Sequence, residues 1–432
     1  MRICERWQTI LLWCAMLPDQ SATAIAERPH SGASSLNADV VIIGAGIAGG
    51  ALATVLARAG VDVLLLERSL EHQDVVRGEW IAPWGVAEVK SLGLYDLYMQ
   101  HGGHHLARHI TFSEGVPADE AAKHALDLST LLPGIPGPLC LGHPRMCTLL
   151  DEAAVAAGAR LLRGVRRTEV LPGETPTVRF EHAGVVHTLR PKLVVGADGR
   201  NGLTRQQIGI ALHEDQQHHW FSGMLVEDVE GWPEDLQCIS TEGDVNALVF
   251  PQSASRVRLY LSFATAQRGR FHGPTGPQQF LDAFALKSIP GVQGILRGRP
   301  AGPCNVYPNH DTWTDVPFVP GVVLIGDAAG RNDPITGQGL SITHRDVRLV
   351  RDVLLAGSDW SGHAFAPYAM ERAERMRRLR FAAAMTSVRE AEFGDGWTGT
   401  GKVSPTIWPL WSGVRTISTS APTFRMRRCG SM

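Results

Sequence analysis

The sequence of 432 residues lacks the patterns that mark disulfide-rich, membrane-spanning and nucleic-acid-binding proteins. Its seven cysteines are scattered without a CxxC pair or regular spacing, which argues against a disulfide framework or a zinc site and is usual for a reduced, cytoplasmic protein. No apolar run approaches the length of a membrane span. The formal net charge is only −2, so nothing indicates a nucleic-acid surface. Internal repeats and low-complexity tracts are also absent.

A glycine-rich segment near the start of the chain predicts a dinucleotide-binding strand–helix–strand unit. Residues 39–43 form a β-branched run that indicates a buried strand, and residues 48–59 repeat small and apolar residues at helical spacing. A second strand over 61–66 is closed by Glu67. Between the first strand and the helix stand three glycines in the spacing Gly-x-Gly-x-x-Gly: Gly44, Gly46 and Gly49.

Each part of this unit has a physical task. The first glycine permits the tight turn, the second lets the backbone approach a pyrophosphate, and the third lets helix and strand pack closely. The positive helix N-terminus faces the negative charge. Glu67 stands where a carboxylate accepts hydrogen bonds from a ribose diol, which argues against a 2′-phosphate and so against NADP as the ligand held here.

A second glycine-rich segment, over 322–341, indicates that the dinucleotide is FAD. An apolar strand meets Gly326 and Asp327, and an aspartate at a strand end can accept hydrogen bonds from a polyol such as ribitol. A helix that begins near Leu340 would aim its positive end at the flavin pyrimidine ring and stabilise the negative charge that reduction places there. NAD has no ribityl chain. The residues that precede this helix are Pro334, Gly337, Gln338 and Gly339.

The chain is long enough for two intertwined domains. We expect an α/β fold in which a Rossmann-like FAD-binding domain is interleaved with a mainly antiparallel β substrate domain, followed by a helical C-terminus. Alternating segments at Met224–Val229, Ala247–Phe250 and Val257–Phe263 predict the antiparallel sheet, with Pro251 in a connecting turn. The expected ranges are 38–211 and 301–360 for the FAD-binding domain, 212–300 for the substrate sheet and 361–432 for the helical C-terminal segment.

Residues 1–37 precede the first expected strand. The short apolar run Ile10–Leu17 behind two arginines fits a secretory leader. Glu5 disrupts the positive n-region, and an FAD enzyme supplied by a soluble reductant belongs in the cytoplasm. These points favour a disordered extension, or a start codon placed too early, and a cytoplasmic location.

Three motifs in this order resemble those of the class A flavoprotein monooxygenases, the p-hydroxybenzoate hydroxylase-like family. The resemblance covers about residues 38–360. Three ordered motifs are far more specific than any one of them. The motifs are Gly44-x-Gly46-x-x-Gly49 with Glu67, Ala197-Asp198-Gly199 with Arg205, and Gly326-Asp327 followed by Pro334 and Gly337-Gln338-Gly339.

The resemblance implies which residues bind the cofactor. The first motif holds the ADP half of FAD, the motif with Asp327 holds the ribityl chain, and the motif with Asp198 is associated with both FAD and NAD(P)H. Arg77 and Arg145 match arginines that contact FAD, Arg77 at the pyrophosphate, and Arg68 beside Glu67 joins the expected set. Pro334 and Gly337 would lie beside the reacting face of the flavin.

The implied activity is that of an FAD-dependent monooxygenase. NAD(P)H docks transiently and reduces the flavin, and dioxygen then forms a C4a-hydroperoxyflavin that hydroxylates or epoxidises an electron-rich organic substrate. The substrate domain shields this chemistry from water. No acid or base side chain is compulsory, so no catalytic residue is assigned. The substrate, the choice between NADH and NADPH and the oligomeric state stay open.

Departures from the family pattern keep the alternatives open. The family often has His where this chain has Gly330, Asn where it has Ser341, and Ser near Gly202. Together these departures leave the nicotinamide role of Asp198 unsettled. The alternatives are an FAD-dependent reductase of isoprenoid-type substrates, a non-enzymatic FAD-binding protein, and a flavin halogenase, whose usual Trp-x-Trp-x-Ile-Pro segment is absent here.

Other conspicuous side chains have simpler interpretations. Two groups of histidines (101, 104, 105 and 109; 213, 218 and 219) lack metal-ligand spacing, so no metal site is expected, although a histidine near the substrate could act as an acid or base. Trp80, Trp84, Trp220 and Phe221 either line an apolar pocket or pack in the core. The basic run Arg372–Arg380, interleaved with Glu371 and Glu374, is typical of a solvated helix face.

Overall fold

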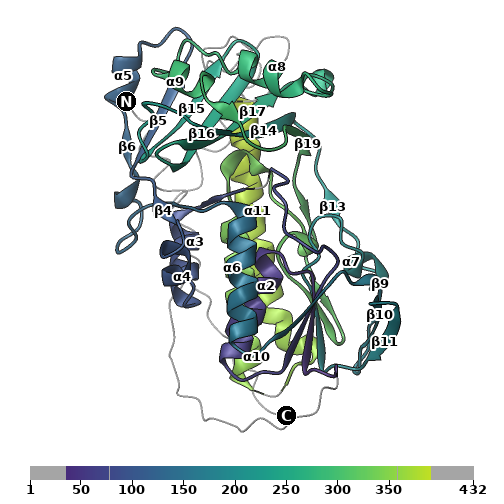
Figure 1. Cartoon of the computed structure of the whole chain (residues 1–432). Coiled ribbons are helices and arrows are strands. Elements are labelled where there is room, and N and C mark those ends of the chain that lie inside the picture. Colours follow the sequence, from purple (N-terminus) through teal and green to yellow (C-terminus); the bar gives the residue numbers. More distant parts are fainter. Residues whose placement is uncertain (1–35, 77, 358, 391–432) are drawn as a thin grey trace, which may run out of the picture.

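The computed structural model describes residues 36–76, 78–357 and 359–390. A parallel sheet and a mainly antiparallel sheet lie toward opposite ends of the molecule, and long helices run between them (Figure 1). The predicted α/β fold is confirmed. The expected N-terminal extension or leader lies almost wholly outside the described residues, as does the C-terminal segment beyond residue 390.

The parallel sheet is the frame of the dinucleotide domain. Its order is β21-β22-β12-β1-β2-β8, and every neighbouring pair is parallel except β21 with β22. The central strands are uninterrupted apolar runs because both of their faces are covered. The strands are β1 (Val40–Ile43), β2 (Val63–Glu67), β8 (Arg160–Arg163), β12 (Leu193–Gly196), β21 (Phe318–Val319) and β22 (Val322–Leu324).

Different layers cover the two faces of this sheet. Val40 and Ile42 point into a core formed with the helices α2 (Ile47–Arg58), α6 (His143–Ala156) and α10 (Gly339–Ala356). Val41 and Ile43 alternate to the other face. That face packs on a three-stranded antiparallel sheet of β9 (Arg166–Leu171), β10 (Thr177–His182) and β11 (Val185–Leu189).

The antiparallel sheet extends beyond the expected range of 212–300. Strands from residues 108–127 and 299–309 join it, and β5 pairs in parallel with β15. Pro251 lies inside β16 beside a register shift, so its predicted place in a turn is wrong. The strands are β5 (Arg108–Ser113), β6 (Leu126–Asp127), β14 (His219–Glu227), β15 (Leu236–Glu242), β16 (Val245–Ser253), β17 (Arg256–Phe263), β18 (Arg299–Pro300) and β19 (Asn305–Asn309).

One face of this sheet is closed by the short helices α5 (Ala118–Ala122), α8 (Gly276–Ala283) and α9 (Val292–Leu296). Smaller elements join the two large sheets. The sheet order β3-β7-β4 combines β3 (Trp80–Ile81), β4 (His104–His105) and β7 (Leu139–Cys140). The others are α3 (Pro83–Ser91), α4 (Tyr95–Met99), α7 (Thr204–Gln207) and the strand pair β13 (His213–Glu214) with β20 (Thr312–Trp313).

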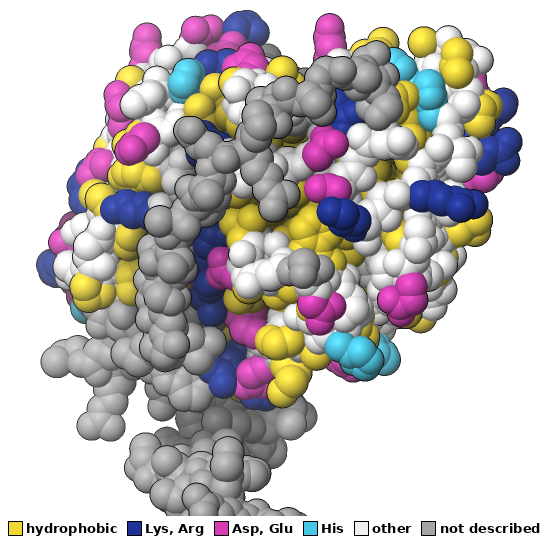
Figure 2. Space-filling model, turned by 90° about the horizontal axis from the view of Figure 1, so that it is seen from below, with side chains coloured by type: hydrophobic (Ala, Val, Ile, Leu, Met, Phe, Trp, Pro, Cys, Tyr) yellow, Lys and Arg dark blue, Asp and Glu magenta, His cyan; other side chains and the backbone are white. Residues whose placement is uncertain are grey.

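Charges are mixed on the surface. On the face shown in Figure 2, basic and acidic side chains lie interspersed, and hydrophobic side chains gather near the middle. Within residues 36–390, leaving aside 77 and 358, no helix is long and apolar enough to cross a membrane.

The last described helix, α11 (Ala366–Glu390), runs from the parallel sheet toward the antiparallel one (Figure 1). Its predicted solvated basic face is wrong for two arginines: Arg372 is fully buried and Arg375 is 6% exposed. Arg377 and Arg378 fit the prediction better, since both pair with the half-exposed Glu374.

Arg372 and Arg375 are buried because they meet a buried carboxylate, Asp346 of α10. Asp346 accepts hydrogen bonds from Arg372 Nε at 3.0 Å and from Arg375 Nη2 at 2.7 Å. It also accepts one from the backbone N–H of Gly326 at 2.9 Å. These partners outweigh burial and hold the pKa of the carboxyl below its usual value.

The guanidinium of Arg372 also reaches the loop that follows β22. It donates to the backbone carbonyls of Ala329 at 2.9 Å, Gly330 at 3.0 Å and Gly326 at 3.2 Å. Asp346 and Arg372 together therefore fix both ends of the turn that carries Asp327.

Replacing Arg372 with Met should destabilise the fold by about 3–5 kcal/mol, because a buried carboxylate and backbone carbonyls lose their partner. Chemical denaturation measures this directly. The matched variant R377M, on the same helix but 65% exposed, should leave the denaturation midpoint nearly unchanged. Equal effects of the two substitutions would contradict the role given to the buried network.

Candidate active site

The first glycine segment forms the turn between β1 and α2, and its glycines have distinct surroundings. Gly44 has φ of +100°, and a Cβ there would lie 2.5 Å from the carbonyl oxygen of Ala197. A Cβ at Gly49 would meet the carbonyl oxygen of Gly44 at 1.9 Å. At Gly46, the N-cap of α2, a Cβ would meet nothing within 4 Å. Open space thus lies at a helix N-terminus, where a pyrophosphate fits.

Glu67 ends β2 beside this turn. Its carboxylate accepts hydrogen bonds from the backbone N–H of Ala45 at 2.8 Å and of Ser69 at 2.7 Å. Arg68 and Arg145 are exposed and lie outside the cavity lining described below, and Arg77 lies outside the described residues. The cofactor roles of these three arginines stay predictions.

Asp198 shapes the turn after β12. Its Oδ2 accepts hydrogen bonds from the backbone N–H of Thr204 at 2.9 Å and from the Thr204 hydroxyl at 2.8 Å. A Cβ at Gly202 would lie 2.2 Å from the carboxyl group, so the departure at this position follows from close packing. The neighbours Ala197 and Gly199 line the cavity, whereas Asp198 does not. Its direct contact with a cofactor stays a prediction.

Asp327 lies in the turn fixed by Asp346 and Arg372, half-buried, and lines the cavity. The turn ends at Gly330, where φ is +108° and a Cβ would lie 2.4 Å from the carbonyl oxygen of Thr312. A larger residue such as histidine would collide with β20 at this point. This explains why the chain has Gly330 where the family often has His.

The third segment ends in a left-handed residue, Gly337, with φ of +67°. The ring of Trp80 lies 3.0 Å from the position of a Cβ there. The side chain of Gln338 is held within the protein: its Oε1 accepts from Trp84 Nε1 at 2.8 Å, and its Nε2 donates to the Thr336 carbonyl at 2.6 Å. Trp84 is therefore a core residue, and Gln338 would meet a ligand mainly through its backbone.

Ser341, which stands where the family often has Asn, lies in the first turn of α10. Its hydroxyl accepts a hydrogen bond from the backbone N–H of Ala82 at 2.9 Å. A Cβ at Gly85 would approach the Ser341 hydroxyl oxygen to 2.3 Å. Close packing of α3 on α10 thus favours a small residue here.

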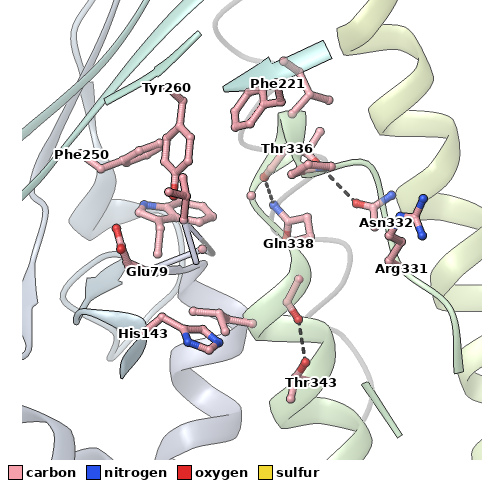
Figure 3. Close-up of a pocket in the computed structure, with 18 of the residues that line it drawn as sticks. Glu79, His143, Phe221, Phe250, Tyr260, Arg331, Asn332, Thr336, Gln338 and Thr343 are labelled. Carbon is pink, nitrogen blue, oxygen red and sulfur yellow. Dashed lines mark hydrogen bonds between the residues drawn. The ribbon is translucent and has the colours of Figure 1, made fainter. Parts of the chain in front are cut away.

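These segments converge on one cavity of about 500 Å³. On the dinucleotide side its lining includes Gly46, Asp327, Pro334, Gly337, Gln338 and Gly339. On the side of the antiparallel sheet the lining includes Phe221, Ile239, Leu248, Phe250, Tyr260 and Tyr307. Glu79, Phe250 and Tyr260 lie on one side of the opening, with Thr336 and Gln338 facing them across it (Figure 3).

Glu79 is a cavity residue that the sequence did not indicate. It is 3% exposed and accepts hydrogen bonds from Arg258, at 2.6 Å from Nη2, and from Gln252. The same Arg258 nitrogen lies 2.5 Å from Asp74. Burial raises the pKa of the Glu79 carboxyl even though Arg258 lowers it. Arg258 and Gln252 lie on β17 and β16, far from Glu79 in the sequence, so no local pattern could have revealed these contacts.

The histidines form no metal centre among the described residues, where no cluster of three His, Cys, Asp or Glu is placed to bind a metal. His109 and His143 line the cavity. Burial lowers the pKa of His109 to about 4, so its imidazole is neutral near pH 7. Of the four aromatic residues considered, Trp80 and Phe221 line the cavity, whereas Trp220 donates its indole N–H to the Thr265 carbonyl.

A profile of a known protein family, described as an FAD binding domain, matches residues 37–381. The chain belongs to this family. It is therefore an FAD-dependent oxidoreductase of the monooxygenase family, and the resemblance to class A flavoprotein monooxygenases is confirmed. The match includes each of the segments that line the dinucleotide side of the cavity.

Individual members of the family are only distantly similar. The 3-demethoxyubiquinol 3-hydroxylase of Escherichia coli (strain K12) is 28% identical over 359 residues, which cover 79% of this chain and 85% of that protein. The squalene monooxygenase of Mus musculus is 23% identical over 328 residues, which cover 73% of this chain. The chain spans about half of that protein's length (54%).

Solved structures confirm the fold. PqsL of Pseudomonas aeruginosa, described as a probable FAD-dependent monooxygenase, has a TM-score of 0.69 at 20% identity, covering 82% of this chain and 96% of PqsL. The p-nitrophenol 4-monooxygenase PnpA of Pseudomonas putida DLL-E4 has a TM-score of 0.71 at 18% identity, covering 83% of this chain and 90% of PnpA. The myxobacterial halogenase CndH has a TM-score of 0.71 at 19% identity, covering 88% of this chain and 89% of CndH. The fold alone thus does not separate a monooxygenase from a halogenase.

Replacing Asp327 with Ala should weaken FAD binding about 10- to 150-fold, because a charge-assisted hydrogen bond to a ribityl hydroxyl is lost. Equilibrium titration of apoprotein with FAD measures this change. D352A, which removes a 43% exposed carboxylate of α10, is the control and should leave the affinity unchanged. Unaltered FAD affinity in D327A would show that the ribityl chain lies elsewhere.

Asp333, which precedes Pro334, should make the stability of the protein depend on pH. Burial raises the pKa of its carboxyl to about 7. Its contribution to stability is then fully present below about pH 4 and is lost as the pH rises through about 7, at about 1.4 kcal/mol for each pKa unit. D333N cannot ionise but keeps an oxygen for the Ile335 N–H, which Asp333 accepts at 2.9 Å.

The stability of D333N relative to the native protein should therefore rise between about pH 4 and pH 8. Urea denaturation at several pH values across this range measures the difference. A difference that does not change with pH would mean that Asp333 does not titrate in this range.

Proposed function

We propose that this protein is an NAD(P)H-dependent monooxygenase that hydroxylates or epoxidises an electron-rich organic molecule. The observation that carries the proposal is that the dinucleotide segments and the antiparallel sheet line the same cavity. A flavin held by the first would face a substrate held against the second. Bound FAD, once reduced by NAD(P)H, supplies the activation of dioxygen.

The residues of the chain bind, orient and exclude water. The N-terminus of α2 at Gly46 would receive the pyrophosphate, and Asp327 would accept hydrogen bonds from the ribityl chain. The N-terminus of α10 at Gly339 would place its positive end beside the flavin ring and stabilise negative charge there.

The sheet side of the cavity excludes water with an aromatic wall. The rings of Phe221 and Tyr260 stack with centroids 4.9 Å apart, and Phe250 meets Tyr260 edge-on at 6.1 Å. Such a wall fits a flat, apolar substrate and keeps the reacting region dry.

Incorporation of labelled oxygen tests this proposal. The purified protein should be yellow because it binds FAD. With NADPH or NADH and a panel of phenols, quinones and polyenes under ¹⁸O₂, it should form a product that carries one ¹⁸O atom. Mass spectrometry detects this product. Substrate reduction without oxygen uptake would favour the isoprenoid-type reductase instead. Chloride-dependent halogenation would favour the halogenase, and a colourless protein that binds no FAD would contradict the proposal altogether.

A further inference from the structure

A series of hydrogen bonds along the cavity wall links Trp80, Gln237 and His109. Trp80 Nε1 donates to Gln237 Oε1 at 2.7 Å, and Gln237 Nε2 donates to His109 Nδ1 at 3.2 Å. His109 Nε2 lies 3.1 Å from the hydroxyl of Thr111. Gln237 of β15 and His109 of β5 are direct partners in the parallel register, so both point to the same face.

The indole N–H of Trp80 fixes which atom donates and which accepts in each of these hydrogen bonds. An indole N–H can only donate, so the amide oxygen of Gln237 must face Trp80 and its nitrogen must face His109. His109 Nδ1 then accepts, which places the imidazole proton on Nε2. The neutral state of His109 near pH 7 agrees with this assignment.

Gln237 keeps hydrogen-bonding capacity after these contacts. Its oxygen has a second lone pair and its nitrogen a second proton. The residue is 8% exposed and lines the cavity, so neither group has ready access to bulk water. A ligand with a hydroxyl or carbonyl group would satisfy them.

The surroundings limit what such a ligand can be. Trp80 and Phe250 both line the cavity and pack against each other with ring centroids 6.3 Å apart, so together they offer an aromatic wall for a substrate ring. Glu79, next to Trp80 in the chain, already occupies the Arg258 guanidinium, and the neutral His109 offers a carboxylate no positive charge. The arginines of the lining, Arg200 and Arg331, come from the turns that follow β12 and β22.

Gln237 is also placed near the expected flavin. The ring of Trp80 lies against Gly337, and its Nε1 bonds to Gln237. One indole therefore separates Gln237 from the segment 334–339, which faces Glu79 across the opening in Figure 3. A group held by Gln237 would keep the attached ring beside that segment.

We propose that Gln237 is a positioning residue that binds the hydroxyl or carbonyl group of an uncharged aromatic substrate. This inference rests on the proposed function, because it assumes that the cavity wall at Gln237 contacts the molecule that is oxidised. Trp80 and His109 set the orientation of the amide, and the aromatic wall receives the ring.

The test compares the binding of three probes to the oxidised holoenzyme by equilibrium dialysis: 2-naphthol, naphthalene and 2-naphthoate. Neither reductant nor substrate turnover is needed. In the native protein 2-naphthol should bind about tenfold more tightly than naphthalene, and 2-naphthoate should bind more weakly than 2-naphthol. In Q237M the advantage of the hydroxyl should disappear, so that 2-naphthol and naphthalene bind about equally.

Two further variants separate positioning from a structural role. N305L removes another polar side chain of the lining and is the control, which should retain the preference for 2-naphthol over naphthalene. W80F removes the indole N–H that orients the Gln237 amide but keeps a ring against Gly337, so it should reduce the preference. A structural defect in Q237M would weaken both neutral probes equally and leave their ratio unchanged, which would overturn the role of Gln237.

Two further results would overturn the substrate class. Tighter binding of 2-naphthoate than of 2-naphthol would show that the cavity selects an anion, and no binding of either neutral probe below about 1 mM would show that it does not receive such rings. If the probes behave as expected but no ¹⁸O is incorporated into any product, the proposed function fails while the binding role of Gln237 stands.

Discussion

The structure depends on one buried ion-pair network, in which Asp346 of α10 meets Arg372 and Arg375 of α11. Burying these charges is costly unless each finds partners, and the turn after β22 supplies them through one backbone N–H and three carbonyls. The network therefore ties the last described helix to the turn that carries Asp327. The geometry of the candidate flavin site follows from a contact between segments that lie far apart in the sequence.

Helix α11 also packs against the substrate side of the cavity. Met376 and Leu379 pack with Trp84 beneath the segment that contains Gln338. Farther along, Ala383 joins the cluster of Phe221 and Tyr260 on the antiparallel sheet. One helix thus contacts both halves of the cavity, which explains how a loop that binds a cofactor and a sheet that binds a substrate keep a fixed relation.

Local patterns were sufficient to predict the dinucleotide unit, because its glycines, helix and Glu67 follow one another within 30 residues. They were insufficient for the sheet, since β5 pairs with β15 across more than 100 residues and carries no signal of that pairing. The same limit applies to the site. Glu79 with Arg258, and Gln237 with His109, are pairs that only tertiary packing creates. The prediction for the arginines of α11 was wrong for the same reason. Their spacing fits a solvated face, and their burial follows from tertiary partners, above all Asp346.

The central claim is that FAD lies along the three segments that line the dinucleotide side of the cavity. A crystal structure of the purified protein with FAD tests it most directly. The account predicts the pyrophosphate at the N-terminus of α2, the ribityl hydroxyls at Asp327 and the flavin ring beside residues 334–339. A flavin ring bound outside this cavity, with Asp327 making no contact to the ribityl chain, would contradict it.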